Sequence, residues 1–322
     1  MTYSRIVGTG RYLPERVLSN FDLEKMVDTT DEWIRTRTGV ERRHVVDPEQ
    51  TTSDMCVEAA KKAIEAAGVR AEDIDLVITG TTSPDLVFPN VSTLIQHRLG
   101  IPACPAFSLE AACTGFIYAL TVADKFIRLG EAKCALVMGA ECITKLLDWD
   151  DRNTCVLFGD GAGAAIVMPS EEPGIILTKL GADGQYKELL YYPVGPSKNL
   201  ELAGTDAAAI QMTGNEVFKV AVTTLGNIAS ETLEKAGIDK AELDWLIPHQ
   251  ANIRIIQATA KRLGLPMEKV IVTVQDHGNT SAASVPMALD VSIRDGRVKK
   301  GQLVLMEAFG GGFTWGSVLM RL

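Results

Sequence analysis

The sequence predicts an α/β protein with a mainly parallel sheet, arranged as two similar halves. Short apolar runs such as 74–80 have the length of buried strands, and they alternate with longer segments whose apolar residues recur at helical spacing. The helix end, glycine and strand at 68–78 match those at 237–247, an offset of 169 residues. A polar break with two prolines lies at 169–173, so we expect halves of residues 1–170 and 171–322.

Each element follows from its own pattern. The first helix is expected to end at Gly68, because glycine is the usual residue after a helix C-terminus. The glycine-rich piece 156–167 lacks the Lys-Ser or Lys-Thr of a phosphate-binding loop, so close backbone packing is its expected use. The other main elements expected, in chain order, are a helix at 51–67, a strand at 74–80, a helix at 91–99, a strand at 101–107, a helix at 117–129, a strand at 134–140 and a helix at 283–293.

Composition excludes several classes of function. A net charge of -9 argues against a general nucleic-acid binder. The six cysteines form no C-x-x-C pair, so we expect neither a zinc ribbon nor a thioredoxin-like site, and no metal. We find no signal-peptide pattern at the N-terminus and no apolar run long enough to cross a bilayer. A cytoplasmic protein that does not bind membranes is the expectation.

The stretch 108–116 carries the first candidate for chemistry. Cys113 stands between an expected strand and an expected helix, with Ala111, Ala112 and Gly115 as small neighbours. The N–H groups at a helix N-terminus favour a thiolate, so we expect a lowered pKa and a nucleophilic sulfur. The alternative, that Cys113 only fills space in the core, stays open on this stretch alone.

Two further candidates lie in the second half. The offset of 169 carries the Cys113 junction to 277–282, where Asn279 again precedes an apolar-periodic helix. His249 follows Pro248 at the end of an apolar strand, the edge at which α/β folds place their sites. Facing halves would therefore bring a cysteine, a histidine and an asparagine into one pocket.

These segments, with the stretch 307–316, resemble β-ketoacyl-acyl carrier protein synthase III over essentially the whole chain. The resemblance implies the thiolase-like fold, two duplicated βαβαβαββ-type halves in a layered αβαβα arrangement. It also implies an acyltransferase that starts type II fatty acid synthesis without a cofactor. Cys113 would take an acyl group from an acyl-CoA, usually acetyl-CoA. Malonyl-acyl carrier protein would then lose carbon dioxide and attack that acyl group, assisted by His249 and Asn279 and by the backbone N–H groups of Cys113 and Gly311.

The resemblance also assigns residues that bind substrates and partners. Contacts with CoA are implied for Trp33, Arg37, Arg152, Phe218 and Asn252, although Asn153 stands where well-known members have glycine. Phe88 would reach the acyl pocket of the partner subunit in a homodimer. The residues implied to contact the carrier protein are Gln250, Ala251, Asn252, Ile253, Arg254, Lys219, Lys261 and Arg262.

Two other interpretations remain open. A related condensing enzyme could use a branched or longer primer, or could start a polyketide, because no motif reveals the depth of the acyl pocket. A scaffold that binds the carrier protein without catalysis is a remote alternative, and the complete set of Cys113, His249 and Asn279 argues against it.

Overall fold

A computed structural model describes residues 3–205 and 207–322 of the chain. The first two residues of the expected first half lie outside the described residues. The strands are β1 (Tyr3–Tyr12), β2 (Val17–Ser19), β3 (Arg42–His44), β4 (Leu76–Gly80), β5 (Ala106–Leu109), β6 (Ala135–Glu141), β7 (Gly161–Ser170), β8 (Ile175–Ala182), β9 (Leu190–Tyr191), β10 (Gln211–Met212), β11 (Trp245–Pro248), β12 (Leu303–Gly310) and β13 (Thr314–Arg321). The α-helices are α1 (Asn20–Leu23), α2 (Asp31–Thr38), α3 (Thr52–Ala67), α4 (Val91–Arg98), α5 (Gly115–Leu129), α6 (Gly214–Ala236), α7 (Ile253–Leu263), α8 (Val274–His277) and α9 (Ser284–Arg294).

The two main sheets have the same topology, which confirms the duplication. The first has the order β1-β7-β6-β4-β5, with the β1–β7 and β7–β6 pairs antiparallel and the other two parallel. The second has the order β8-β13-β12-β11, antiparallel at the same two pairs and parallel between β12 and β11. A single parallel bridge from Leu246 to Val270 stands where the first sheet has β5.

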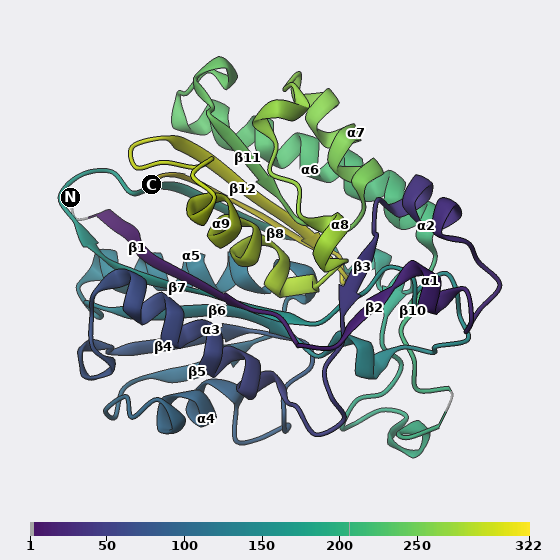
Figure 1. Ribbon diagram of the computed structural model, residues 1–322. Helices are drawn as coiled ribbons and strands as arrows, with labels where there is room; N and C mark the ends of the chain where they lie inside the picture. The colour runs from purple at the N-terminus through teal and green to yellow at the C-terminus, as the bar shows by residue number, and fades with distance from the viewer. Residues whose placement is uncertain (1–2, 206) are drawn as a thin grey trace.

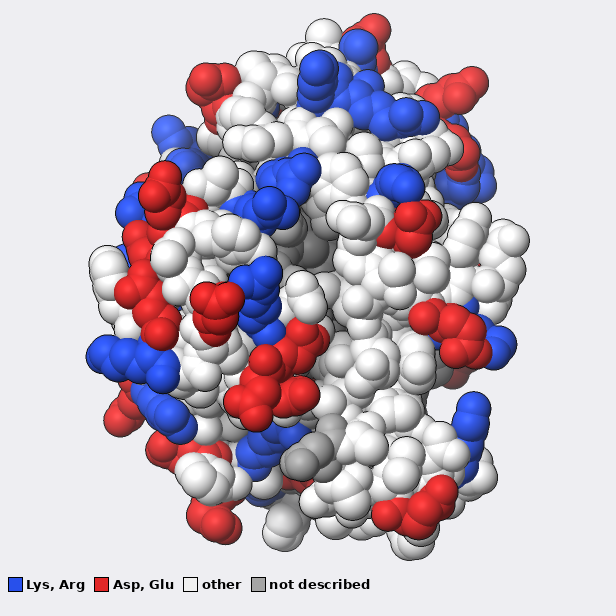
Figure 2. Space-filling model, turned by 90° about the vertical axis from the view of Figure 1, so that its right-hand side faces the viewer, with Lys and Arg blue, Asp and Glu red and all other residues white. Residues whose placement is uncertain are grey.

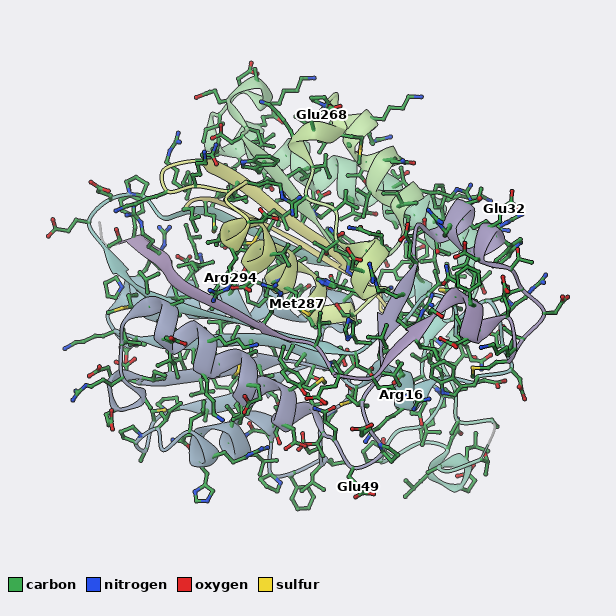
Figure 3. All side chains as sticks on the ribbon, viewed as in Figure 1. Arg16, Glu32, Glu49, Glu268, Met287 and Arg294 are labelled. Carbon is green, nitrogen blue, oxygen red and sulfur yellow. The ribbon has the colours of Figure 1, made fainter. Side chains whose placement is uncertain are left out.

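The sheets and helices form five layers (Figure 1). Helices α3 and α4 cover the outer face of the first sheet, α5 and α9 lie between the sheets, and α6 and α7 cover the second sheet. The central layer is the most apolar: α5 and α9 bury residues such as Ile117 and Leu289 against both sheets. Met287 on α9, labelled in Figure 3, is fully buried there. No α-helix among the described residues is long and apolar enough to span a bilayer.

The expected strand at 101–107 is wrong in its bounds, since β5 begins only at Ala106. Pro102 and Pro105 lie in the run before it, and a proline has no N–H to give to a strand ladder. The helix expected from 117 starts two residues earlier, at Gly115. The glycine-rich piece becomes β7 from Gly161 onward, packed closely between β1 and β6 as its small residues allow.

Each half contains the same unusual backbone turn just before its central helix. Ala112 has φ 46° in the 3-10 turn η2 (Ala112–Thr114), and Ser281 has φ 49° in the turn η8 (Ser281–Ala283). A side-chain-bearing residue adopts such values rarely, so packing must hold both turns in place. The residues are 169 apart, which is the sequence offset. Cys113 follows the first turn residue, and Ala282 follows the second.

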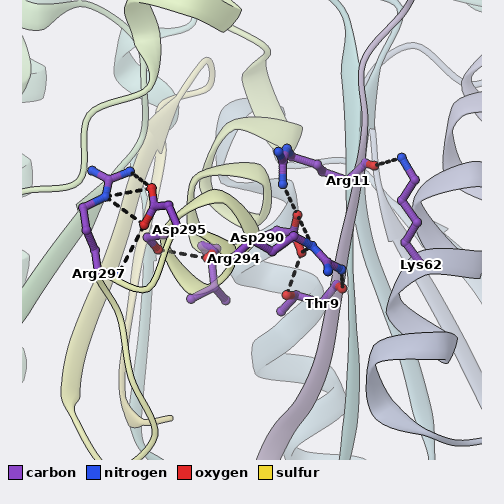
Figure 4. Close-up of polar contacts among 9 residues, drawn as sticks. Thr9, Arg11, Lys62, Asp290, Arg294, Asp295 and Arg297 are labelled. Atoms are coloured by element: carbon purple, nitrogen blue, oxygen red, sulfur yellow. Dashed lines mark hydrogen bonds and ion pairs between the residues drawn. The ribbon is translucent and has the colours of Figure 1, made fainter.

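Each central helix carries a buried aspartate that pairs with partly exposed arginines and links the two halves. On α9, Asp290 is fully buried and accepts hydrogen bonds from Thr9 Oγ1 at 2.8 Å, Arg11 at 2.5 Å and Arg294 at 3.0 Å, as Figure 4 shows. The Arg294 guanidinium also donates to the Thr9 carbonyl of β1.

The same arrangement is found on α5. Asp124 binds Ser4 Oγ at 2.6 Å and Arg128 at 2.7 Å, and Arg128 donates to the carbonyl of Ile175 on β8. Each central helix therefore fixes the first strand of the opposite half. These contacts therefore fix the position of one half of the chain relative to the other.

Candidate active site

A pocket of about 440 Å³ lies between the two halves and contains the three residues that the sequence singled out. Cys113, His249 and Asn279 all line it, and each is at least nine-tenths buried. Phe309 from the end of β12 lines it beside them. Trp33 from α2 lines the same pocket together with exposed residues, so the pocket leads from the surface to the cysteine.

The expected lowering of the cysteine pKa is wrong. Burial raises the pKa of the Cys113 thiol to about 12, partly offset by a hydrogen bond from the Ser281 side chain. Cys113 lies in the turn η2, which leads directly into α5, and not in the first turn of that helix. Loss of water around the thiolate dominates instead.

His249 is held in a neutral form. It follows β11, where its backbone N–H donates to the Glu307 carbonyl of β12 at 2.8 Å. Burial lowers the pKa of His249 to about 3. Its Nδ1 lies 2.6 Å from Ser284 Oγ, and that hydroxyl already accepts from the Gln250 N–H. Ser284 thus has its hydrogen to donate to Nδ1, an arrangement that keeps the imidazole proton on Nε2.

Asn279 has a fixed amide orientation. Its Oδ1 accepts a hydrogen bond from the Ser281 N–H at 2.9 Å, so the amide NH₂ is left to donate into the pocket. The backbone of Asn279 bridges to Phe158, which attaches this turn to the first half of the chain. His249 and Asn279 therefore present two uncharged donors in a buried chamber.

Backbone from the β12–β13 turn closes against the cysteine. A Cβ atom placed on Gly310 would lie only 2.6 Å from the Cys113 backbone nitrogen, so only glycine allows this approach. Gly311, the second expected donor to the acyl carbonyl, lies next: its Cβ position is 3.7 Å from Ala112 Cβ. The turn therefore places Gly311 beside Ala112, the residue before the nucleophile, and its role as a donor stays a prediction.

The outer end of the pocket carries the expected aromatic and basic residues. The guanidinium carbons of Arg37 and Arg152 lie 5.1 and 5.2 Å from the centre of the Trp33 ring. Arg37 and Trp33 line the pocket, as does Asn153, whose amide turns back to Asp151. Arg152 does not line it; this residue binds the Asp28 carbonyl at 2.8 Å.

Phe218 and Asn252 line the middle of the pocket. Asn252 caps α7 through its Oδ1, which accepts from the Arg254 N–H at 2.8 Å. The Arg254 guanidinium stacks over the Phe218 ring at 5.3 Å and lies at the pocket rim. Figure 2 shows this face of the molecule, hollowed near its centre and with Lys and Arg residues along the rim of the hollow.

The structure corrects part of the expected carrier-protein surface. Gln250 is 1% exposed, and its amide binds backbone groups, including the carbonyl of Pro248 at 2.7 Å and the N–H of Thr273 at 2.8 Å. This side chain supports the site from inside and cannot contact a carrier protein. The sequence misassigned it because Gln250 adjoins exposed residues in the chain. Arg262 is exposed and binds Asn227 of α6 at 2.9 Å.

The other members of that surface are accessible. Arg254, Lys219 and Lys261 are exposed, and Lys219 pairs with Glu216 at 2.8 Å. Ala251 lines the pocket. Ile253 is half-buried and packs beside Gly39, the residue that follows α2.

Phe88 lies outside the pocket of its own chain. It is 83% exposed and follows Leu86 and Val87, which are 53% and 71% exposed. Three successive exposed apolar residues form an unusual surface for a chain on its own.

Sequence reasoning missed three polar residues around the site. Ser284 contacts His249, Ser281 contacts Asn279 through its backbone, and Glu141 at the end of β6 is buried next to Ser281 at 3.3 Å. Ser284 is 35 residues from His249 in the chain, and Ser281 is 140 residues from Glu141, so only the fold brings these pairs together. Glu141 ends an apolar strand, and a charged residue in such a run is a signal that could have identified it as a site residue. Within the described ranges, no group of three or more His, Cys, Asp or Glu residues is arranged to hold a metal ion.

Comparisons with known proteins agree with this geometry. Residues 107–184 match the family model of 3-oxoacyl-acyl-carrier-protein (ACP) synthase III, and residues 233–322 match its C-terminal model. The chain is 62% identical to a beta-ketoacyl-acyl-carrier-protein synthase III of Thioalkalivibrio sulfidiphilus over 321 residues, covering all of both chains. It is 60% identical to the enzyme of that name from Xanthomonas campestris over 319 residues, covering 99% of this chain and 98% of the relative.

Solved structures give the same result. The crystal structure of 3-oxoacyl-acyl-carrier-protein synthase III from Aquifex aeolicus matches with a TM-score of 0.93 and 49% identity, covering 99% of this chain and all of that one. A priming β-ketosynthase of the R1128 polyketide pathway matches with a TM-score of 0.94 and 39% identity, covering 99% and 96%. The chain has the thiolase-like fold of these proteins. It belongs to the β-ketoacyl-acyl carrier protein synthase III family of condensing acyltransferases.

Proposed function

We propose that this enzyme condenses an acyl-CoA primer, acetyl-CoA first among them, with malonyl-acyl carrier protein. The products are a 3-oxoacyl carrier protein, CoA and carbon dioxide, and the reaction starts fatty acid synthesis. One observation carries the proposal: Cys113, His249 and Asn279 line a single pocket that also contains Trp33 and Arg37 at its outer end. A flat base can stack on the Trp33 ring beside two guanidinium groups, while the pantetheine arm reaches the sulfur.

The first half-reaction is acyl transfer to Cys113. The Cys113 sulfur attacks the thioester carbonyl, a tetrahedral intermediate forms, and CoA leaves as a thiolate. Developing negative charge on the carbonyl oxygen is stabilised by the backbone N–H groups of Cys113 and Gly311, which need no charge and no reorganisation. A covalent acyl-enzyme divides one difficult condensation into two easier steps.

The second half-reaction is decarboxylation followed by carbon–carbon bond formation. As the malonyl group loses carbon dioxide, its thioester oxygen becomes an enolate. His249 Nε2–H and the Asn279 amide donate to that oxygen, and both donors are neutral at pH 7 because burial keeps the pKa of His249 near 3. The enolate carbon then attacks the acyl group on Cys113 and releases the sulfur.

Two partners complete the proposal. Arg254 lies at the pocket rim, and Lys261 lies two helical turns further along the same face of α7. Together they form a basic surface that suits an acidic carrier protein. A second copy of the chain would cover the exposed apolar residues 86–88, and we propose a homodimer in which Phe88 of each subunit closes the acyl pocket of the other. The cytoplasm is the proposed location.

Intact-protein mass spectrometry after mixing with acetyl-CoA tests the central claim. The wild-type chain should gain one acetyl group, and Cys113→Ser should gain none and lose all condensation. A wild-type chain that gains no acetyl group would contradict the proposal and would favour a scaffold that only binds the carrier protein.

A second candidate is a starter enzyme with another primer, favoured by the similarity to the R1128 priming β-ketosynthase. A panel of straight and branched acyl-CoAs, assayed with malonyl carrier protein, separates the two. Acetyl-CoA should give the highest kcat/KM; a branched or longer primer that exceeds it would assign the enzyme to the second candidate.

A further inference from the structure

A fully buried arginine close to the active site has no acidic partner. Arg43 on β3 is 0% exposed. Burial lowers its pKa to about 10, so the guanidinium still carries its charge at pH 7. None of the carboxylates in the part of the chain that the structure describes forms an ion pair with it, and its Nε has no hydrogen-bond partner there. A buried charge without a counter-ion costs stability, and such exceptions to the packing rules mark residues that serve a function.

The guanidinium of Arg43 binds three oxygen atoms of other segments. Its Nη1 donates to the Leu18 carbonyl of β2 at 3.2 Å and to Oδ1 of Asn20 at 2.9 Å. Its Nη2 donates to the Val156 carbonyl at 2.7 Å. We call residues 156–159 the wall segment, because three of the four line the active-site pocket. The planar fork of the guanidinium therefore attaches the wall segment to β2 and β3.

The wall segment in turn holds Asn279. The Asn279 N–H donates to the Leu157 carbonyl at 2.8 Å, and the Asn279 carbonyl accepts from the Gly159 N–H at 3.0 Å. The stem of Arg43 packs against the same place, because a Cβ atom on Gly159 or on Gly278 would lie only 3.0 or 3.2 Å from Arg43 Cβ. Both backbone groups of Asn279 are therefore fixed by a segment that Arg43 anchors at its first residue.

We propose that Arg43 is a positioning residue for the second half-reaction: it holds the wall segment, and through it the Asn279 amide, where the enolate oxygen forms. Arg43 itself does not line the pocket. Cys113 and Gly311, which serve the first half-reaction, belong to other elements, η2 and the β12–β13 turn. A loss of this anchor should therefore slow decarboxylation and leave acyl transfer intact. This inference rests on the proposed function.

Two substitutions remove the fork of Arg43 in different ways. Arg43→Lys keeps the charge, but an ammonium on a flexible stem does not reproduce the planar arrangement that reaches Val156 on one side and Asn20 on the other. Arg43→Gln removes the charge and offers a single NH₂ group on a shorter side chain. Because Arg43→Gln also removes an unpaired buried charge, it should be at least as stable as Arg43→Lys.

The test compares the two half-reactions in these variants. Acetylation of Cys113 by acetyl-CoA, followed by intact mass, should proceed at the wild-type rate in both. The acetylated enzyme is then mixed with malonyl carrier protein, and loss of the acetyl group reports the second half-reaction. Both variants should lower its rate at saturation about tenfold with the KM for malonyl carrier protein unchanged, since a displaced donor should cost less than the 10²–10³-fold of a missing one.

A double variant separates positioning from general damage. In the Asn279→Ala background the amide is already absent, so adding Arg43→Lys should lower the rate by no more than about twofold, whereas independent effects would multiply. Arg5→Lys is the matched control. The Arg5 side chain is also mostly buried, but it donates to the Pro173 carbonyl at 3.5 Å and does not line the pocket. Both half-reactions of this control should match the wild type, and thermal melting checks the fold of each variant.

Several results would overturn the positioning role. Equal losses in the two half-reactions, or no loss in either, would show that Arg43 supports only the fold. A tenfold loss that persists in the Asn279→Ala background would show that Arg43 acts through another residue. Normal decarboxylation in Arg43→Lys with a loss in Arg43→Gln would assign the effect to the charge and not to the fork. A wild-type enzyme that is not acetylated at all would instead overturn the proposed function.

Discussion

Replacing Gly310 by alanine should disturb the packing around Cys113 without removing any reacting group. The added Cβ would lie 2.6 Å from the Cys113 nitrogen, 3.1 Å from Ala112 Cβ and 3.2 Å from Cys113 Cα. Ordinary contacts begin near 3.4 Å, so the nucleophile and the β12–β13 turn must separate by about 0.8 Å. Gly310 does not have a positive φ, so its backbone can accept alanine and the perturbation is the clash with Ala112 and Cys113.

A displacement near 1 Å at a reacting centre can cost on the order of 10²-fold in rate. We therefore expect Gly310→Ala to acetylate Cys113 about 10²-fold more slowly than wild type. Overpacking should also cost about 1–3 kcal/mol of stability, which leaves a protein of this size folded at 25 °C. Quenched-flow acetylation with acetyl-CoA, followed by intact mass, gives the rate, and urea unfolding gives the stability.

Gly214→Ala is the matched control. Gly214 also lines the pocket, but the nearest atom to its Cβ position is Met212 Cε at 3.7 Å, an ordinary contact. This variant should acetylate at the wild-type rate. A folded Gly310→Ala that also reacts at the wild-type rate would show that the close approach of the turn to Cys113 has no part in acyl transfer.

Four other changes have specific outcomes. Arg254→Glu should raise the KM for malonyl carrier protein about tenfold with Cys113 acetylation unchanged, and an unchanged KM in steady-state assays would place carrier docking elsewhere. Ser284→Ala should slow malonyl decarboxylation at least tenfold and acetylation less, because the imidazole loses its fixed tautomer; equal losses in both half-reactions would argue against this. Asp290→Ala should lower the free energy of unfolding by about 1–3 kcal/mol in urea titrations, because it removes the buried acceptor of the hydrogen bonds from Thr9, Arg11 and Arg294, and an unchanged midpoint would refute the clamp between the halves. Burial raises the pKa of Glu307 to about 8, so the contribution of this group to stability is full below pH 4.5 and is lost as the pH rises from there through 8. Glu307→Gln should remove up to about 5 kcal/mol of that loss, and identical pH profiles of wild type and variant would contradict it.

The fold could be predicted because its signals are local. Glycines such as Gly68 and Gly237 end helices in left-handed conformations, and apolar strands follow them at the same spacing in both halves. The offset between these repeats led directly from Cys113 to the junction that carries Asn279. A duplicated chain thus predicts half of a site from the other half.

The electrostatics of the site could not be predicted in the same way. A helix N-terminus suggested a lowered pKa for Cys113, but the second half of the chain packs over the sulfur and removes its water. Gln250 looked like a surface residue because Arg254 follows it closely, yet its side chain binds backbone inside the protein. Glu141 and Ser281 are 140 residues apart, and only the folded chain shows that they meet. Burial and partners between distant segments are properties of the packed structure.

Burial shifts the pKa values of Cys113 and His249 in opposite directions. It raises the pKa of the Cys113 thiol to about 12 and lowers that of His249 to about 3, since each charged form loses its water. Moving the proton from the sulfur to the imidazole would create two buried charges, and both pKa shifts oppose it. The chamber therefore disfavours the thiolate–imidazolium pair on which cysteine proteases depend. It suits a histidine that stays neutral and donates to an enolate.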